Sequence, residues 1–329
     1  MIKLTIILSL TGLALLLQPA ARADDNCAGM RPGLNHITVM SGGQKQNIDL
    51  VLPASFVASK RVRLVIGLHP SGGTGTALDQ DTGLGAAATA KGFAVIFPDG
   101  GVRQSTSDSG YFWNIPGVPL IGGGDVPSGS RDDMRFIADV IDHVVKNNCV
   151  DAHRIYVTGF SGGARMSSAV ACSLAGRVAA VAPVAGLRAG VAEAPAFTEP
   201  DALDCRPSRP LSVLAIHGTD DPTNPFPGGG DRRWGYSVER AMARWATLDH
   251  CDEAYALDKI SERVTRVHYR ACSNGSEVEL YRIDAPRDQG GGHVWPGGRR
   301  DLSARAASSG GGGVKLDATA VVLEFFAHH

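Results

Sequence analysis

The pattern of apolar and polar positions along the chain predicts a sheet whose strands alternate with helices. Short apolar runs end in clusters of Gly, Pro, Asp or His, as buried parallel strands do. Stretches with helical spacing lie between them, which indicates a doubly wound, mostly parallel sheet with helices on both faces. The predicted strands are 36–39, 46–52, 63–68, 93–97, 155–157, 178–184, 211–216 and 277–283, and the predicted helices fill 76–90, 132–147, 162–171, 237–248 and 318–328.

Two segments depart from this alternation. The first two strands flank the turn Ser41-Gly42-Gly43 and alternate apolar with polar residues, which predicts a hairpin at a sheet edge. The segment 101–130 is rich in Gly, Pro and Ser and contains Tyr111, Phe112 and Trp113. Long loops in compact domains commonly cover functional sites, so we expect this segment to cover a cleft.

The N-terminus has the pattern of a signal peptide. Lys3 precedes an apolar run over 4–17 that is too short to span a bilayer, and Ala21-Arg22-Ala23 forms an A-x-A cleavage site. We expect residues 1–23 to be removed and residues 24–329 to form a single catalytic domain. The mature protein is therefore expected to be secreted, either extracellular or periplasmic, and not to be associated with a membrane.

Charge and cysteine content exclude some functions. The net charge is −1, without a basic run, so no nucleic-acid partner is expected. Metal-ligand spacings and nucleotide-binding glycine motifs are missing from the sequence, so no metal or cofactor is expected. The chain has six cysteines, an even number that suggests three disulfides in an exported protein, among 15 possible pairings.

The strongest chemical signal is Gly159-Phe160-Ser161-Gly162-Gly163, which fits the nucleophile elbow G-x-S-x-G. It follows a predicted buried strand and opens a predicted helix, as the motif requires. A chain with 41 glycines also forms G-x-S-x-G by chance in an ordinary loop, so the motif needs partners. Ser161 would be the nucleophile, and the Gly162 N–H at the helix N-terminus would bind an oxyanion.

A serine hydroxyl needs a histidine to take its proton and a carboxylate to orient that histidine. Asp221 and His293 follow later strands, which gives the chain order Ser, Asp, His of α/β-hydrolases. Asp220 is adjacent to Asp221 and is expected to be a solvated turn residue. His69 and His217 also end strands, where we expect packing or loop-fixing roles.

The remaining candidate residues surround the elbow. The second oxyanion donor should follow the strand 63–68, and Ser71 is the candidate, with Gly72 as the alternative. Trp295, Trp113 and Tyr111 are candidates for the wall of an acyl pocket. These aromatic residues would equally suit a protein core.

Together these motifs resemble the secreted polyhydroxybutyrate depolymerase and feruloyl esterase family of α/β-hydrolases, which is related to acetylxylan-type carbohydrate esterases. The resemblance spans nearly the whole mature chain and rests on the segments 68–73, 97–100, 159–163, 182–186, 217–222 and 291–297. It implies the α/β-hydrolase fold and supports Asp221 as the acid and His293 as the base. It departs at His69-Pro70, where the family usually has His-Gly, so Ser71 must supply the N–H that proline lacks.

The resemblance also implies disulfides. It suggests that Cys172 pairs with Cys205 and Cys251 with Cys272, and this leaves Cys27 with Cys149.

We therefore expect a secreted serine esterase that acts on hydroxycinnamoyl or acetyl polysaccharide esters or on hydroxyalkanoate oligomers. Two alternatives remain open at this point. One is a serine peptidase on the same fold, and the other is a non-catalytic binding module on an α/β-hydrolase-like scaffold.

Overall fold

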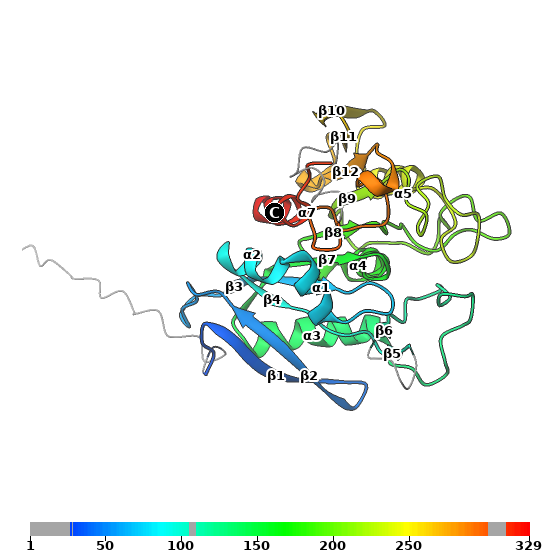
Figure 1. Cartoon of the computed structure of the whole chain (residues 1–329). Coiled ribbons are helices and arrows are strands. Elements are labelled where there is room, and N and C mark those ends of the chain that lie inside the picture. Colours follow the sequence, from blue (N-terminus) through cyan, green and yellow to red (C-terminus); the bar gives the residue numbers. More distant parts are fainter. Residues whose placement is uncertain (1–26, 28, 105–109, 302–313) are drawn as a thin grey trace, which may run out of the picture.

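The computed structural model describes residues 27, 29–104, 110–301 and 314–329 and is organised around one ten-stranded sheet (Figure 1). The strand order is β1-β2-β4-β3-β7-β8-β9-β12-β11-β10. The predicted signal peptide and the cleavage site after Ala23 lie outside the described residues. The strands are β1 Gly33–Ser41, β2 Gln44–Leu52, β3 Val62–Leu68, β4 Phe93–Ile96, β7 Val150–Phe160, β8 Ala180–Val184, β9 Ser212–Gly218, β10 Tyr255–Ser261, β11 Val264–Tyr269 and β12 Val278–Ile283.

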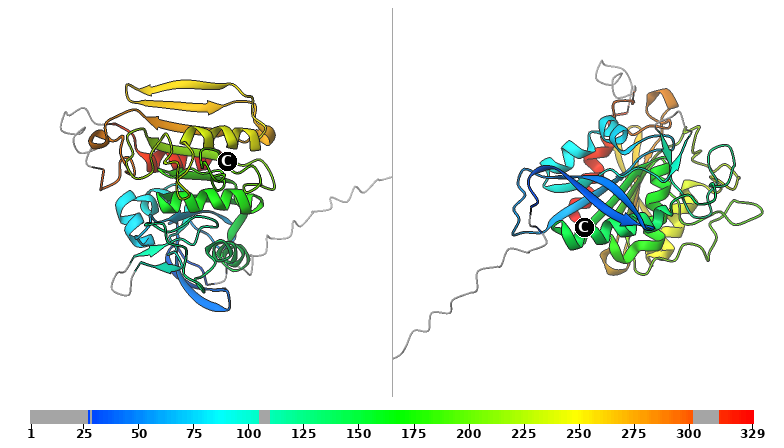
Figure 2. Two further views of the ribbon diagram at one scale, coloured as in Figure 1. Left: turned by 90° about the vertical axis from the view of Figure 1, so that its right-hand side faces the viewer. Right: turned by 90° about the horizontal axis from the view of Figure 1, so that it is seen from below.

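The centre of the sheet is parallel, and its two edges are antiparallel. Strands β4, β3, β7, β8, β9 and β12 pair in parallel, whereas β1–β2 and β10–β11 are hairpins at opposite edges (Figure 2). In β3 nearly every residue is buried, but β1 alternates buried and exposed positions. The two patterns are those of a strand covered on both faces and of one covered on a single face. The predicted doubly wound, mostly parallel sheet is confirmed.

Helices cover both faces of this sheet, so the apolar core consists of two clusters. One apolar cluster includes side chains of α3 (Asp133–Asn147), α4 (Gly162–Leu174) and α5 (Val238–Leu248). The other includes side chains of α2 (Leu84–Ala90) and α7 (Ala318–His328). Short 3₁₀ turns cover Ala175–Arg177, Ser273–Gly275 and Arg287–Gln289.

The predicted helix boundaries hold with small shifts. Asp132 and Ser237 are the N-caps of α3 and α5, and their side chains accept backbone N–H groups of the first turn. The helix expected to run through Ala90 is divided into α1 (Gly75–Thr82) and α2. The break falls at Gly83, whose φ of 65° ends α1 in the left-handed region.

Two pairs of strands were not predicted. Residues between Cys251 and Cys272 form the hairpin β10–β11, and the segment 101–130 contains the short pair β5 (Val102–Arg103) and β6 (Tyr111–Phe112). Much of β10 is exposed at the edge of the sheet, so it lacks the apolar run that identifies a buried strand. The pair β5–β6 is too short to produce any periodic signal.

Three disulfides link elements far apart in the sequence: Cys27 to Cys149, Cys172 to Cys205 and Cys251 to Cys272. The last two are the pairs that the family resemblance implies, and the first is the pair that these two leave over. The structure contains no helix, among the residues it describes, with the length and apolarity needed to cross a bilayer.

Candidate active site

Ser161 occupies the turn that joins β7 to α4. Its φ of 55° and ψ of −111° are rarely adopted by a residue with a side chain, and such strain costs about 1–3 kcal/mol. The turn is held by its neighbours, because the Ser161 N–H donates to the Val184 carbonyl at 3.0 Å and the Arg165 N–H donates to the Ser161 carbonyl at 3.1 Å. This is the backbone of a nucleophile elbow.

Glycines flank Ser161 because the chain has no room for other residues there. A Cβ at Gly159 would lie 2.9 Å from the Leu68 carbonyl oxygen and closer still to the Gly163 carbonyl. A Cβ at Gly163 would collide with the backbone of Leu68 and His69. The elbow therefore packs directly against the end of β3, as expected from the motif.

This packing brings the two proposed oxyanion donors together. A Cβ on Gly162 would lie 2.9 Å from the backbone nitrogen of Ser71, so the two residues are in direct proximity. Gly162 is the first residue of α4, where backbone N–H groups have no acceptor within the helix. The Gly72 N–H donates to the Tyr111 carbonyl at 2.8 Å and is therefore occupied. These contacts favour Ser71 over Gly72.

Asp221 and His293 meet across the loops after β9 and β12. The Nδ1 of His293 lies 2.7 Å from Oδ2 of Asp221, whose side chain is completely buried. The other oxygen, Oδ1, accepts the N–H groups of Thr223 at 2.8 Å and Asn224 at 2.9 Å. Both carboxylate oxygens are thus used, and the orientation of the carboxylate is fixed.

Electrostatics determine which nitrogen of His293 carries a proton. Burial raises the pKa of Asp221, but hydrogen bonds from His217 and His293 outweigh burial and hold that pKa below its usual value. Asp221 is therefore an anion that can only accept, so His293 donates through Nδ1. The neutral imidazole then carries its lone pair on Nε2, as a general base requires.

The ring of His293 lies against the nucleophile elbow. It stacks on the ring of Phe160 with centroids 5.0 Å apart, and Phe160 directly precedes Ser161. The side chain of His293 is 17% exposed and Ser161 is 6% exposed, so both lie just below the surface. Histidine and serine thus lie at the same rim of the sheet.

Asp220 has a role that the sequence did not reveal. Its carboxylate accepts the Arg287 N–H at 2.9 Å and forms an ion pair with the Arg287 guanidinium at 3.1 Å. The Asp220 N–H also donates to the Gly291 carbonyl at 3.0 Å. Asp220 therefore anchors the loop that carries His293, whereas Asp221 contacts the imidazole itself.

His69 and His217 are buried beside this site. In His69, Nε2 accepts the Gly100 N–H at 2.9 Å, so Nδ1 must carry the proton that it donates to the Pro70 carbonyl at 2.8 Å. The Nε2 of His217 is 2.9 Å from the Asn224 carbonyl and 3.4 Å from Asp221 Oδ2. Each histidine fixes a loop of the site, as expected from the sequence.

The three aromatic residues that were candidates for a pocket wall have different environments in the structure. Trp113 is 3% exposed and donates its indole N–H to the His69 carbonyl, and Trp295 is 2% exposed and donates to Thr319 Oγ1. These two indoles pack in the core, the alternative role considered for them. Tyr111 is half-buried and pairs with Gly73 beside the oxyanion loop.

Comparisons with known proteins place the chain in a family. Residues 46–228 match the family model described as "Esterase PHB depolymerase". Feruloyl esterase B of Piromyces equi is 27% identical over 256 residues, 76% of this chain and 42% of that protein. The putative esterase NocK of Nocardia uniformis subsp. tsuyamanensis is 28% identical over 251 residues, 71% of this chain and 66% of that protein.

Both relatives are longer than the region they share with this chain, which spans 42% of one and 66% of the other. The solved structure of an acetyl xylan esterase from Aspergillus awamori superimposes with a TM-score of 0.50 at 16% identity, covering 80% of this chain and 95% of that one. This similarity establishes the α/β-hydrolase fold. Because the family model covers more than half of the sequence, the chain belongs to the esterase PHB depolymerase family of ester hydrolases.

Proposed function

We propose that the protein is a secreted serine esterase in which Ser161, His293 and Asp221 form the catalytic triad. The observation that carries this proposal is the 2.7 Å hydrogen bond between His293 and the buried Asp221, formed beside a strained serine elbow. The family assignment supports ester hydrolysis independently of this geometry.

The reaction follows from the protonation states at the site. Ser161 Oγ attacks the ester carbonyl carbon while its proton moves to Nε2 of His293. The oxyanion of the tetrahedral intermediate is stabilised by the N–H groups of Ser71 and Gly162. His293 then returns the proton to the departing alcohol, leaving an acyl group on Ser161. A water molecule then attacks the acyl carbon and gives a proton to Nε2 of His293. The bond to Ser161 Oγ breaks, His293 returns the proton to Oγ, and the carboxylic acid is released.

The anionic Asp221 keeps the proton of His293 on Nδ1 throughout and stabilises the imidazolium that forms during each transfer. Asp220 and Arg287 act indirectly by holding the loop that carries the histidine. The half-buried Tyr111 is the proposed aromatic contact for substrate, since its backbone is joined to the oxyanion loop.

The substrates we propose are carboxylic esters of hydroxycinnamic acids or acetylated polysaccharides, or oligomers of hydroxyalkanoates. The names of the relatives, a feruloyl esterase and an acetyl xylan esterase, support the first two, and the name of the family supports the third. Secretion is supported by the signal-peptide pattern and by three disulfides. N-terminal sequencing of exported protein would start at Asp24 if cleavage follows Ala23.

The proposal is tested by assaying matched ester and amide substrates with the wild-type protein and Ser161→Ala. Methyl ferulate, acetylated xylan, a hydroxybutyrate trimer and p-nitrophenyl acetate are the esters, and p-nitroacetanilide is the matched amide of the last. We expect ester hydrolysis that Ser161→Ala abolishes. Faster cleavage of the amide would favour a peptidase. A folded wild-type protein that cleaves nothing and resists a fluorophosphonate probe would be a non-catalytic module.

A further inference from the structure

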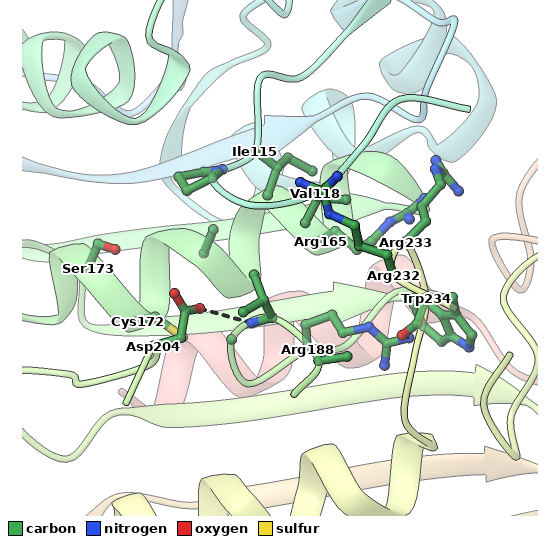
Figure 3. Close-up of a pocket in the computed structure, with 15 residues that line it drawn as sticks. Ile115, Val118, Arg165, Cys172, Ser173, Arg188, Asp204, Arg232, Arg233 and Trp234 are labelled. Carbon is green, nitrogen blue, oxygen red and sulfur yellow. Dashed lines mark hydrogen bonds between the residues drawn. The ribbon is translucent and has the colours of Figure 1, made fainter. Parts of the chain in front are cut away.

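A pocket lies beside α4, and Figure 3 shows the residues that line it, among them Arg165, Cys172 and Ser173 of that helix. Its open volume is about 70 Å³, several times the roughly 10–15 Å³ that one water molecule needs. Arg165 and Ala169 line it from α4, and the loop after β6 contributes Ile115 and Val118. The pocket therefore has room for a small polar group.

Arg165 is the unusual residue of this pocket. It is only 2% exposed, yet its Nε and Nη1 atoms have no hydrogen-bond partner. In the described part of the chain it forms no ion pair, and its guanidinium has Trp234 as a distant aromatic neighbour at 5.8 Å. Buried arginines are almost always paired, because an unsatisfied charged donor is costly. Nothing in the described part of the chain satisfies these two donors, so they are available to a group that enters the pocket.

Three other arginines line the same pocket, Arg188, Arg232 and Arg233, and of these Arg232 is exposed and pairs with Asp125 at 3.3 Å. Arg188 donates through its two Nη atoms to the carbonyls of Leu187, Trp234 and Tyr236, and among the described residues only its Nε has no partner. Its guanidinium carbon lies 3.1 Å from the Trp234 ring centroid. Arg233 lines the pocket as well, and its Nε atom is also without a partner. Both Nη atoms of Arg188 are thus held by the backbone, whereas Arg165 has a buried Nη atom as well as Nε without a partner in the described part of the chain.

The nearby carboxylates do not neutralise this charge. Burial, and then Arg233 and Arg188, hold the pKa of Arg165 well below its usual value, while Asp231 and Asp221 act in the opposite direction. Asp231 uses Oδ1 to accept the N–H groups of Arg233 and Trp234. Asp204 accepts the Val191 N–H at 2.9 Å and lies at the Cys172 end of the pocket, away from the arginines gathered near Trp234 (Figure 3).

Arg165 is also close to the reacting atoms. It follows Ser161 by four residues, slightly more than one helical turn or about 6 Å along α4. Side chains on a helix tend to lean toward its N-terminus, which here is the turn that carries Ser161, and the Arg165 guanidinium is near enough to Asp221 to interact with its charge. A group bound by Arg165 would therefore be separated from the scissile carbonyl by only a few bonds.

We propose that this pocket binds a carboxylate carried by the substrate, with Arg165 as its main donor and Arg233 as the second. The planar fork of a guanidinium matches a carboxylate and binds it through two parallel hydrogen bonds. The substrate class is then an ester with a free carboxylate a few bonds from the scissile carbonyl. This inference rests on the proposed esterase function and adds a selectivity to it.

The selectivity is tested with pairs of esters that differ by one carboxylate. On the acyl side, mono-p-nitrophenyl glutarate is compared with p-nitrophenyl pentanoate, and on the alcohol side 3-acetoxypropanoate is compared with butyl acetate. We expect kcat/KM of the wild-type enzyme to favour the anionic member of at least one pair. In Arg165→Met this preference should fall roughly 10- to 100-fold, the effect of losing a hydrogen bond to a charged group. Arg165→Lys should retain part of it.

Arg240→Met is the matched control, because Arg240 lies on the surface and pairs with Glu199 at 3.1 Å. In this variant, the ratio of kcat/KM for the anionic ester to kcat/KM for the neutral ester should equal that of the wild type. A wild-type enzyme without preference in either pair, or an Arg165→Met variant with an unchanged preference, would overturn the proposal.

Binding is measured separately on Ser161→Ala by calorimetry with glutarate. We expect binding that disappears in the double variant Ser161→Ala/Arg165→Met. Glutarate binding without any substrate preference would mean that the pocket takes free anions only, which also overturns the proposal. Failure of the esterase function is recognised independently, because the neutral esters would then not be cleaved and a fluorophosphonate would not label Ser161.

Discussion

His69 and His293 both follow strands of the central sheet, His69 directly after β3 and His293 in the loop after β12. His69 is completely buried, and both of its ring nitrogens are engaged by the backbone of Pro70 and Gly100. Among the described residues, His293 forms a hydrogen bond only through Nδ1, and its partner is an anion. The difference between the two regions suggests what distinguishes the proposed base from a structural histidine, namely one ring nitrogen that the described residues leave open at the rim that carries Ser161.

The largest effect that we expect is the loss of kcat on replacing His293. His293→Ala removes the proposed base, and we expect kcat for ester hydrolysis to fall by about 10⁶, as for the loss of a triad histidine. Initial rates with p-nitrophenyl acetate measure this fall. A loss of only a few-fold would mean that another group takes the proton from Ser161.

The next effect tests the anionic partner of His293. Asp221→Asn keeps the size of the side chain but no longer holds the proton of His293 on Nδ1, so we expect kcat to fall by about 10⁴. Asp220→Asn is the neighbouring control, and a much smaller loss is expected because Asp220 contacts Arg287 instead of the imidazole. Equal losses in the two variants would contradict the assignment of the acid.

A smaller effect is expected at the oxyanion loop. Ser71→Pro deletes the backbone N–H that lies beside Gly162, and the loss of one such donor typically lowers kcat by about 10²–10³. Ser71→Ala retains that N–H and should retain most of the activity. If Ser71→Ala were as impaired as Ser71→Pro, the hydroxyl and not the N–H would be the contributing group. Circular dichroism of both variants verifies that they are folded.

The smallest effect concerns stability at His69. Burial lowers the pKa of His69 below its ordinary value of 6.5, so the unfolded chain binds this proton more readily than the folded one. The free energy of unfolding should therefore decrease as the pH falls below about 6.5. His69→Phe leaves the Gly100 N–H unpaired, which costs about 1–3 kcal/mol at pH 8, but it should flatten this pH dependence. Urea titrations at several pH values measure the free energy of unfolding and its pH dependence. His153→Phe is the control, because His153 is exposed.

Much of this architecture could be predicted from the sequence. The buried apolar runs identified the central strands, and the N-capping residues Asp132 and Ser237 fixed where two helices begin. The hairpin β10–β11 was not predicted, because a strand is recognised by the apolar residues that it buries, and β10 at the edge of the sheet is mostly exposed. The break between α1 and α2 was not predicted, because Gly83 lies within a run of helix-forming residues and was the one sign that a helix ends there.

The site was predictable to a similar extent, for a physical reason. Ser161, Asp221 and His293 stand after strands, and parallel strands bring their carboxyl ends to one edge of the sheet. The arginines of the pocket were not recognised, because Arg165 is an ordinary helix residue until burial removes its water. The anchoring role of Asp220 also required coordinates, since its partner Arg287 is 67 residues away.

The most direct test of the triad is a crystal structure of the protein after reaction with a fluorophosphonate. The account predicts a covalent adduct on Ser161, with the phosphonyl oxygen about 2.7–3.1 Å from the N–H groups of Ser71 and Gly162. It also predicts Nε2 of His293 within hydrogen-bonding reach of Oγ, about 2.6–3.2 Å. An adduct on another residue, or an imidazole of His293 directed away from Ser161, would contradict it.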